Sequence, residues 1–284
     1  MPGYYNSTEV EQMRKHVLKF YNPEKHLTMT TSNLRVGQLV KYESGGYFKV
    51  TENFFKVTPV ESPLLGRHFD SCAVVGNSGI VLNSKCGQQI DSMDFVFRSN
   101  LPPITGYEKD VGSKANFTTM NPTVILKYYR KWLTSKKDHE RLLRRLRQIG
   151  DQILFVPAFT STKGVNVNVV ARFILQYILP IKTAFSPAGI HNIVKSIWQN
   201  TQFKLRRPST GAHMYALGAT ICDRIHMYGF YPFSKDPYGA NLRYHYYEKS
   251  KIIKVDRHNM SEEFRALQML HQRGALVLHT ETCQ

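Results

Sequence analysis

The chain has 284 residues, of which 42% are hydrophobic, so it is long enough to bury a sizeable core and one domain is the expected count. Its formal net charge of +17 favours acidic partners such as nucleotides, nucleic acid, anionic membranes or acidic sugars. It has no apolar run long enough to cross a bilayer, and its four cysteines form no C-x-x-C pair, which argues against zinc or thioredoxin-like chemistry.

The first 60 residues predict a helix followed by short strands. Residues 8–11 (T-E-V-E) form a capping box, and apolar residues keep helical spacing behind it at Val10, Met13, Val17 and Phe20. Residues 34–60 predict short strands with a turn at Gly45 and Gly46. We expect residues 1–60 to pack on a larger domain formed by residues 61–284, so that the whole is one structural unit.

From Cys72 onward, the pattern alternates between strands and helices. Residues 73–75 and 95–98 predict strands on either side of a helical stretch. Further helices are expected at 138–149, 167–177, 190–199, 210–223 and 261–272, and further strands at 153–156, 226–230 and 275–279. Ser209 and Ser261 are the expected N-caps of the last two helices. This alternation predicts an α/β protein, a single Rossmann-like domain with a mostly parallel central sheet flanked by helices.

A glycine turn, Gly76-Asn77-Ser78-Gly79, follows the first of these strands, and F-R-S-N at 97–100 follows the next. The turn matches neither the dinucleotide fingerprint nor the P-loop. Ligands of parallel sheets bind beyond the carboxyl ends of strands, so Asn77 and Asn100 could face one crevice. The alternative is that each asparagine caps a turn.

A second candidate site is R-P-S-T-G at 207–211, directly before a predicted helix. The free N–H groups of a helix start, together with a hydroxyl, suit a phosphate. A plain N-cap at Ser209 is the alternative.

Two histidines are candidates for proton transfer. His245 lies in Y-H-Y-Y-E (244–248), and His258 opens H-N-M-S-E (258–262) just before a helix. The ordinary pKa of histidine, about 6.5, suits a general base near neutrality. The alternatives are a structural histidine among aromatic rings and a surface histidine. The sequence contains no Asp-x-Asp, H-E-x-x-H or G-x-S-x-G, so any phosphate that leaves must be stabilised by cations and N–H groups rather than by a metal.

Three sequons, at Asn6, Asn116 and Asn259, together with an even number of cysteines, favour the lumen of the secretory pathway. We expect the sequence to be the luminal part of a longer protein. The four cysteines, Cys72, Cys86, Cys222 and Cys283, allow three pairings.

Four stretches taken together resemble the sialyltransferases. Residues 72–104 (CAVVGNSGIVLNSKCGQQIDSMDFVFRSNLPPI) are similar to the large sialylmotif, and residues 207–233 (RPSTGAHMYALGATICDRIHMYGFYPF) to the small one. H-Y-Y-E is similar to the third motif and H-N-M-S-E to the very small motif, in family order. The amino-acid sequence of the four motifs resembles the α-2,8 branch most, and within that branch subtype III. The family's membrane anchor and stem do not occur in this sequence.

The resemblance implies a donor site and two catalytic histidines. The substrate-binding residues would be Gly76, Asn77, Ser78 and Asn100 for CMP, Ser209, Thr210 and Gly211 for the phosphate and the donor carboxylate, and Tyr231 of the Y-G-F-Y-P-F segment. His245 would assist the departing phosphate, and His258 would take the proton from the acceptor hydroxyl. The reaction would invert the anomeric configuration and use no metal and no cofactor beyond CMP-sialic acid as donor.

The resemblance also implies the pairings Cys72–Cys222 and Cys86–Cys283 and a type II membrane protein of the Golgi. The expected acceptors are sialylated glycoproteins and glycolipids, with no nucleic acid, and a homodimer is a candidate assembly. We expect glycans at Asn6 and Asn116. Asn259 directly follows the predicted base, so we expect it to be unmodified or to carry a glycan directed outward.

Three other functions agree with part of this sequence pattern. A nucleic-acid-binding protein would explain the charge but not the sequons, and no such motif occurs. A non-catalytic sialoglycan-binding module gives no reason for a nucleotide turn with two loop histidines. A sialyltransferase of different linkage is the third alternative. If the enzyme is an α-2,8-sialyltransferase, we expect it to make short oligosialic chains rather than long polymers, because residues 165–203 contain few cations.

Overall fold

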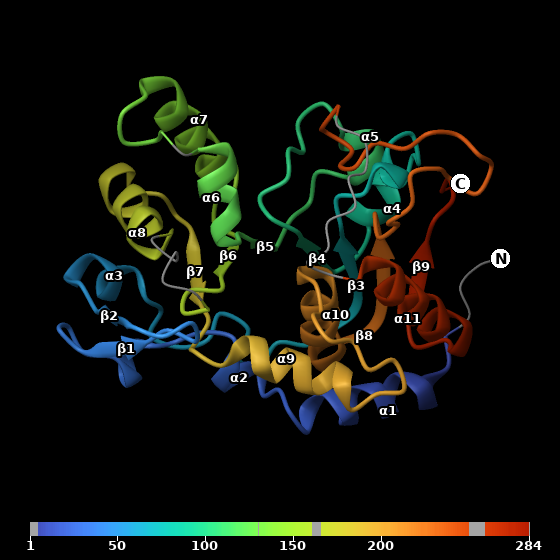
Figure 1. Cartoon of the computed structure of the whole chain (residues 1–284), viewed down its shortest axis with the longest axis horizontal. Helices are drawn as coiled ribbons and strands as arrows, with labels where there is room; N and C mark the ends of the chain where they lie inside the picture. Colours follow the sequence, from blue (N-terminus) through green and yellow to red (C-terminus); the bar gives the residue numbers. More distant parts are fainter. Residues whose placement is uncertain (1–4, 130, 161–165, 250–258, 284) are drawn as a thin grey trace. The chain divides into compact units, whose positions relative to one another are not determined.

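The computed structural model describes residues 5–129, 131–160, 166–249 and 259–283 (Figure 1). Seven strands form one sheet in the order β7-β6-β5-β4-β3-β8-β9. Their bounds are β3 Phe69–Val75, β4 Phe95–Arg98, β5 Phe117–Thr119, β6 Ile153–Val156, β7 Lys182–Phe185, β8 Cys222–Tyr228 and β9 Val277–His279. The pairs β3–β4, β3–β8, β5–β6, β6–β7 and β8–β9 are parallel, so the predicted α/β class is confirmed. A separate antiparallel hairpin joins β1 (Leu39–Lys41) to β2 (Tyr47–Lys49).

Helices alternate with these strands along the chain. They are α1 Ser7–Leu18, α2 Pro23–His26, α3 Glu52–Val57, α4 Gly87–Asp91, α5 Glu108–Val111, α6 Pro122–Tyr128, α7 Lys136–Arg147, α8 Asn166–Tyr177, α9 Ile190–Gln199, α10 Thr210–Ile221 and α11 Met260–Arg273. Short 3₁₀ turns occur at Thr31–Asn33 and Gly79–Val81. The five helices predicted from residue 138 onward are therefore present, with ends that agree or differ by at most two residues.

The chain divides into two compact units that do not follow a single cut in the sequence. Unit 1 comprises residues 1–21, 67–115 and 194–284 and carries β3, β4, β8 and β9. Unit 2 comprises residues 22–66 and 116–193 and carries β5, β6, β7 and the hairpin. The expected separate role for residues 1–60 stays a prediction.

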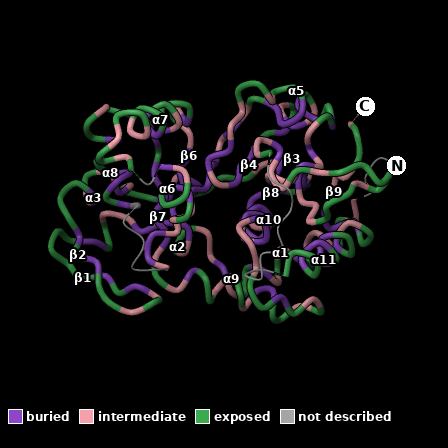
Figure 2. The backbone as a smooth tube through the Cα atoms, turned by 45° about the horizontal axis from the view of Figure 1, so that its top comes forward, coloured by how far each residue is buried: buried purple, intermediate pink, exposed green. Residues whose placement is uncertain are grey.

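In unit 1, helices cover both faces of the sheet. On one face Ala73 and Val75 of β3 pack with Ile90 of α4 and Val111 of α5. On the other face α10 lies so close that its Gly218 is next to the side chains of Ile225 and Phe97. Because α10 is buried along most of its length, as are the inner strands (purple in Figure 2), its N-terminus is held at a fixed point at the strand ends.

In unit 2, aromatic rings build much of the core. Phe54 of α3 packs edge-on against Phe48 of β2, with ring centroids 5.2 Å apart, and at 4.9 Å against Phe185 of β7. Phe159, which follows β6, contacts both Phe48 and Phe54. The hairpin is thereby joined to the strands of unit 2 through side chains.

Two helix starts differ from the prediction. The cap of α1 is Asn6, whose side chain accepts hydrogen bonds from the N–H groups of Thr8 and Glu9, so the predicted capping box at Thr8 is wrong. The cap of α11 is Asn259, which accepts from the N–H of Glu262, so Ser261 lies inside the helix. In both cases an asparagine stands two residues earlier and is at least as good a cap.

The helical stretch expected between the first two strands is present only in part, because α4 begins at Gly87 and not directly after the glycine turn. The chain makes a 3₁₀ turn at Gly79–Val81 and then a loop in which Asn83 and Lys85 have φ of 65° and 57°. The carboxylate of Asp110 accepts hydrogen bonds from both of their N–H groups, at 2.8 and 3.0 Å, and holds this left-handed geometry. Within residues 34–60, the hairpin and its glycine turn are present, but the expected last strand is helix α3, capped by Thr51.

Candidate active site

The glycine turn is bound on two sides by segments from distant parts of the sequence. The N–H groups of Gly76 and Ser78 donate to the carbonyls of Tyr228 (2.7 Å), the last residue of β8, and Gly229 (3.0 Å), which follows it. The hydroxyl of Ser78 donates to the carbonyl of Tyr231 at 2.6 Å. The N–H of Tyr246 donates to the carbonyl of Asn77 at 3.0 Å. The large-motif turn is therefore in contact with both the small and the third motif.

Glycines allow these close approaches. A Cβ atom on Gly76 would lie 2.5 Å from the carbonyl oxygen of Gly229, and one on Gly229 would lie 2.6 Å from the carbonyl oxygen of Gly76. The ring of Phe230 lies against both Gly76 and Gly211, and a Cβ on Gly211 would enter that ring. The turn and the start of α10 thus both contact one aromatic ring.

The two predicted amides lie at neighbouring strand ends. The Nδ2 of Asn77 donates to the carbonyl of Ser99 at 2.9 Å, and its Oδ1 is buried without a hydrogen-bond partner among the described residues. Asn100 follows with φ of 61°, a left-handed conformation that asparagine tolerates better than most residues. An unsatisfied amide oxygen is costly unless a ligand donates to it, so Asn77 fits a nucleotide-binding role.

The start of α10 is organised by a residue that sequence reasoning missed. The Ser209 hydroxyl caps the helix by accepting from the N–H groups of Gly211 (3.0 Å) and Ala212 (3.3 Å). Glu263 of α11, which is 3% exposed, accepts from the N–H of Ser209 at 2.8 Å and from its hydroxyl. The two residues are 54 positions apart in the sequence. The only feature of the nearby sequence that could have drawn attention to Glu263 is that it directly follows the H-N-M-S-E stretch.

His245 is held by two rings and a carboxylate. It lies 4.2 Å from the ring of Tyr244 and 5.2 Å from that of Tyr247, measured between centroids. Its Nδ1 is 3.2 Å from a carboxylate oxygen of Glu248. An isolated bridge pairs its backbone with Ser78 of the glycine turn. The imidazole is therefore oriented and lies beside the turn rather than elsewhere on the surface.

Tyr231 links the turn to α11. Its carbonyl accepts from Ser78, and its ring packs edge-on against Phe264 at 5.2 Å. Burial, with a contribution from the charge of Asp236, raises the pKa of its phenol, so the neutral hydroxyl is the form available to a ligand.

These contacts gather most of the predicted site residues in one place, which we call the strand-end corner: residues 76–79, 99–100, 209–211, 228–231 and 245–248. His258 lies outside the described residues, and the roles assigned to the corner's side chains stay predictions. In the described part of the chain no three His, Cys, Asp or Glu side chains gather as metal ligands would. Nor does any helix there have the length and apolarity to cross a membrane.

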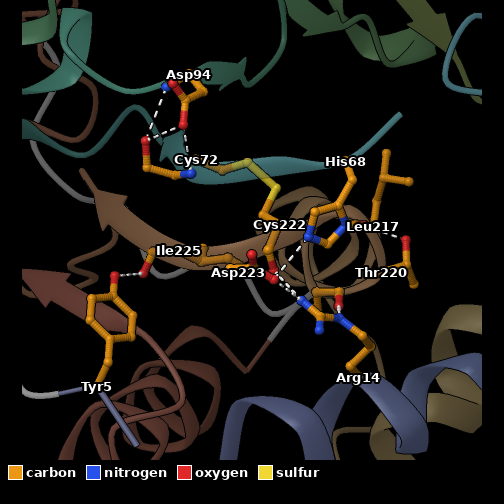
Figure 3. The surroundings of a disulfide bond; sticks show 12 residues. Tyr5, Arg14, His68, Cys72, Asp94, Leu217, Thr220, Cys222, Asp223 and Ile225 are labelled. Carbon is orange, nitrogen blue, oxygen red and sulfur yellow. Dashed lines mark hydrogen bonds and ion pairs between the residues drawn. A yellow bond between two sulfur atoms is a disulfide. The ribbon is translucent and has the colours of Figure 1, made fainter. Parts of the chain in front are cut away.

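Both disulfides implied by the resemblance are present. Cys72–Cys222 joins β3 to the start of β8 (Figure 3). Arg14 of α1 donates from Nη2 to the carbonyl of Cys222 (2.8 Å) and to Asp223 Oδ1 (2.9 Å). Burial raises the pKa of Asp223, but hydrogen bonds from Arg14 and His68 outweigh it and bring that pKa below its usual value. This network fixes β8 beneath the corner.

Cys86–Cys283 ties the C-terminal segment to the loop after the turn. The N–H of Cys283 also donates to the carbonyl of Ser84 at 2.8 Å. Asn6 and Asn116, the expected glycan sites, are both half-buried at their residue positions, while Asn259 is exposed. Glycan occupancy at all three stays a prediction.

A parallel sheet whose carboxyl ends carry a glycine turn, a capped helix start and an oriented imidazole defines an α/β enzyme that binds a nucleotide-linked substrate. The chain belongs to glycosyltransferase family 29, the sialyltransferases, whose profile matches residues 19–275. It is 31% identical over 283 residues to human alpha-2,8-sialyltransferase 8E, a match that covers 98% of this chain and 74% of the relative. The predicted family and enzyme class are therefore confirmed.

The comparison with solved structures also finds sialyltransferases. The crystal structure of a mammalian sialyltransferase superposes with a TM-score of 0.51 at 24% identity, covering 99% of this chain and 90% of the other. At that identity the likeness supports the fold alone. Family membership sets aside the nucleic-acid-binding and non-catalytic alternatives, whereas linkage and substrates require a separate argument.

Proposed function

We propose that the protein is an α-2,8-sialyltransferase that transfers sialic acid from CMP-sialic acid to the 8-hydroxyl of a terminal sialic acid. The observation that carries the proposal is the strand-end corner, where the Gly76–Gly79 turn, the capped start of α10 and His245 meet. The 31% identity to a human enzyme named for this linkage supports the same assignment.

In the proposed donor complex, the nucleotide lies across the glycine turn. The buried Oδ1 of Asn77 accepts a hydrogen bond from the donor, and the side chain of Asn100 contacts it from the next strand end. The N-terminus of α10, with Thr210 and Gly211, faces the phosphate, because its N–H groups and helix dipole favour an anion.

The proposed reaction breaks one bond and forms one. The acceptor O8 attacks the anomeric carbon of the donor sialic acid, and the bond from that carbon to the phosphate oxygen breaks, so the electron pair leaves with CMP. His258 takes the proton from the acceptor hydroxyl, and attack opposite the leaving group inverts the configuration. His245, oriented by Glu248, stabilises the departing phosphate. No metal and no further cofactor take part.

The proposed setting is the Golgi lumen, where the full protein is a type II membrane protein. Its proposed acceptors are sialylated glycoproteins and glycolipids, which it extends by short oligosialic chains. The sequons and the two disulfides support a secretory compartment. Arg206 and Arg207, next to the start of α10, are proposed to bind the acceptor carboxylate.

The test is to incubate the protein with CMP-sialic acid and a chelator, with either an α-2,3-sialylated lactosamine or its asialo counterpart. CMP release and mass spectrometry of the product are the readouts. We expect transfer to the sialylated compound alone. Equal or faster transfer to the asialo compound would overturn the linkage.

The catalytic roles have their own variants. His258→Ala should retain CMP binding and lose at least 10²-fold in turnover, on the order expected for loss of a general base. His245→Ala should lose about 10²–10³-fold through the leaving group. A His258→Ala enzyme that keeps a tenth of the rate would refute the assignment of the base.

A further inference from the structure

The positive charge of the chain is concentrated on one helical surface far from the catalytic motifs in sequence. Residues 127–147 contain nine Lys and Arg against two acidic residues, a net charge of +7 out of +17 for the whole chain. Most of these cations are exposed along α7 and the turn before it (Figures 1 and 2). The charge therefore lies on a surface of unit 2.

Within this surface the cations form one row. Lys137, Arg141 and Arg144 follow each other four and three residues apart, which places them on one face of α7. With Arg145 and Gln148 they line a hollow of about 420 Å³, and we call these five residues the α7 stripe. The stripe rises roughly 16 Å along the helix axis, and its neighbouring cations lie within a Debye length of about 8 Å, so they act together on an anion.

The stripe is poorly neutralised by its own helix. Asp138 pairs with Arg141 at 3.2 Å, and Glu140, which also lines the hollow, lies 4.0 Å from Lys136. No carboxylate of the described residues lies within ion-pair distance of Lys137 or Arg144. These two exposed cations are thus available to an external anion.

Aromatic rings hold several of the cations in place. The guanidinium of Arg141 lies over the ring of Tyr129, which lines the hollow, at 5.6 Å from its centroid. On the neighbouring edge Arg147 lies over Tyr177, whose hydroxyl is 2.6 Å from Nε2 of His139. The aromatic contact restricts where each guanidinium can lie, and a guanidinium is the cation that can bind a carboxylate in a bidentate way.

The form of the stripe indicates a hydrophilic anion rather than a membrane. The apolar side of α7, Leu142, Leu143 and Leu146, is buried in unit 2, and none of the described residues that line the hollow is aliphatic. A helix that lies on a membrane inserts an apolar face, and α7 has none to spare. Leu133, 66% exposed, precedes α7 but does not line the hollow.

We propose that the α7 stripe is an exosite for an acidic oligosaccharide, namely the sialic acid chain of an acceptor. Its carboxylates pair with Lys137, Arg141 and Arg144, and its sugar rings lie in the hollow beside Tyr129. The proposal rests on the proposed function for the identity of the sugar.

The experiment measures binding of a fluorescent α-2,8-linked sialic acid pentamer to the whole chain, without donor. Lys137→Glu with Arg144→Glu is compared with Lys41→Glu with Lys49→Glu, a pair of exposed lysines on the β-hairpin of the same unit that gives the same change in net charge. We expect the dissociation constant to rise at least tenfold in the α7 variant and less than twofold in the hairpin variant. Monomeric sialic acid should not distinguish the three proteins.

Several outcomes would overturn the proposal. Equal weakening in both variants would mean that net charge alone is responsible, and unchanged binding would mean that the stripe is not a site. Binding to vesicles with anionic lipids that is lost in the α7 variant, with no pentamer binding, would make the stripe a membrane contact.

The α7 variant should turn over a monosialylated acceptor at the wild-type rate. If the wild type releases no CMP but still binds the pentamer through α7, the proposed function fails and the exosite stands.

Discussion

The strand-end corner and the α7 stripe are both charged or polar surfaces, but they are specified in opposite ways. The corner is built from backbone: glycines in close contact, carbonyls that accept across motifs and one buried carboxylate at Ser209. The stripe is built from long side chains on a single helix, which Ser135 caps. A substitution in the corner should therefore disturb structure and function together, whereas one in the stripe should change charge alone. The following predictions test this difference, from the largest expected effect to the smallest.

The largest effect is expected from removing the Cys86–Cys283 disulfide. Cys86→Ser with Cys283→Ser should lower the free energy of unfolding by about 2–5 kcal/mol, because a long loop is released in the unfolded state. Urea denaturation measures this change. Reduction of the wild type provides a comparison, and an unchanged midpoint in the double variant would contradict the bracing of the corner.

The second effect is a loss of stability in acid. Burial, aided by the charge of Arg224, lowers the pKa of His226 to about 4, and burial, aided by His226 and His271, lowers that of His279 to about 3. Because the folded-state pKa lies below the unfolded value, the unfolded chain binds more protons between pH 6.5 and 4, and the free energy of unfolding falls as the pH falls. For His226 the loss is up to about 3 kcal/mol across this range.

Denaturation at several pH values checks this. His226→Gln with His279→Gln should flatten the slope of stability against pH, whereas a change at the exposed His191 should not. The five residues of the α7 stripe include no histidine, so pentamer binding should survive where stability falls. If the double variant has the same slope of stability against pH as the wild type, the two histidines are not the source of that slope.

Gly79 tests the backbone of the corner directly. A Cβ there would lie 2.8 Å from the backbone nitrogen of Arg243 and closer still to its carbonyl oxygen, so Gly79→Ala should cost about 1–3 kcal/mol and abolish CMP binding. Gly218→Ala is the control, because its nearest neighbour is a methyl group of Ile225 at 3.3 Å. Normal CMP affinity in Gly79→Ala would show that the turn tolerates displacement.

Glu263 tests the polar support of α10. Glu263→Gln keeps the shape but removes the charge that receives both donors of Ser209, so we expect about 1–2 kcal/mol less stability and a higher KM for the donor. Glu262→Gln, exposed in the same turn, is the matched control. A donor KM equal in both variants would mean that the cap of Ser209 does not depend on Glu263.

The smallest effect is expected on the stripe. Lys137→Gln with Arg144→Gln should change the free energy of unfolding by less than about 0.5 kcal/mol, because neither side chain has an ion-pair partner within the described residues. Thermal denaturation measures it. A larger loss would mean that the stripe supports the fold and would weaken its interpretation as a free binding surface.

The sequence predicted those features that depend on neighbouring residues. The start of α10 followed from Ser209 as a cap, and the inward face of α7 from the spacing of Leu142 and Leu146, which are fully buried. The class of sheet followed from the alternation of strands and helices. The sialylmotifs supplied the site residues, and the structure brings together those that it describes.

Features that depend on distant residues were missed. The loop at Asn83 and Lys85 resembles a helix locally, and the carboxylate that bends it, Asp110, lies 25 or more residues away. Glu263 looked like an ordinary first-turn acid of α11, since its partner Ser209 is 54 residues away. The hollow along α7 depends on Tyr129, which the helical pattern of residues 138–149 does not include.

The two disulfides also determine the order in which the protein can be completed during synthesis. Cys86 must wait for 197 further residues before its partner exists, about 10–40 s at the usual rate of translation. Cys72 waits for 150 residues, and throughout this interval the nearest thiol to each is the other, in the same short segment. The two cysteines on either side of the nucleotide turn therefore stay without their native partners until most of the chain has been synthesised.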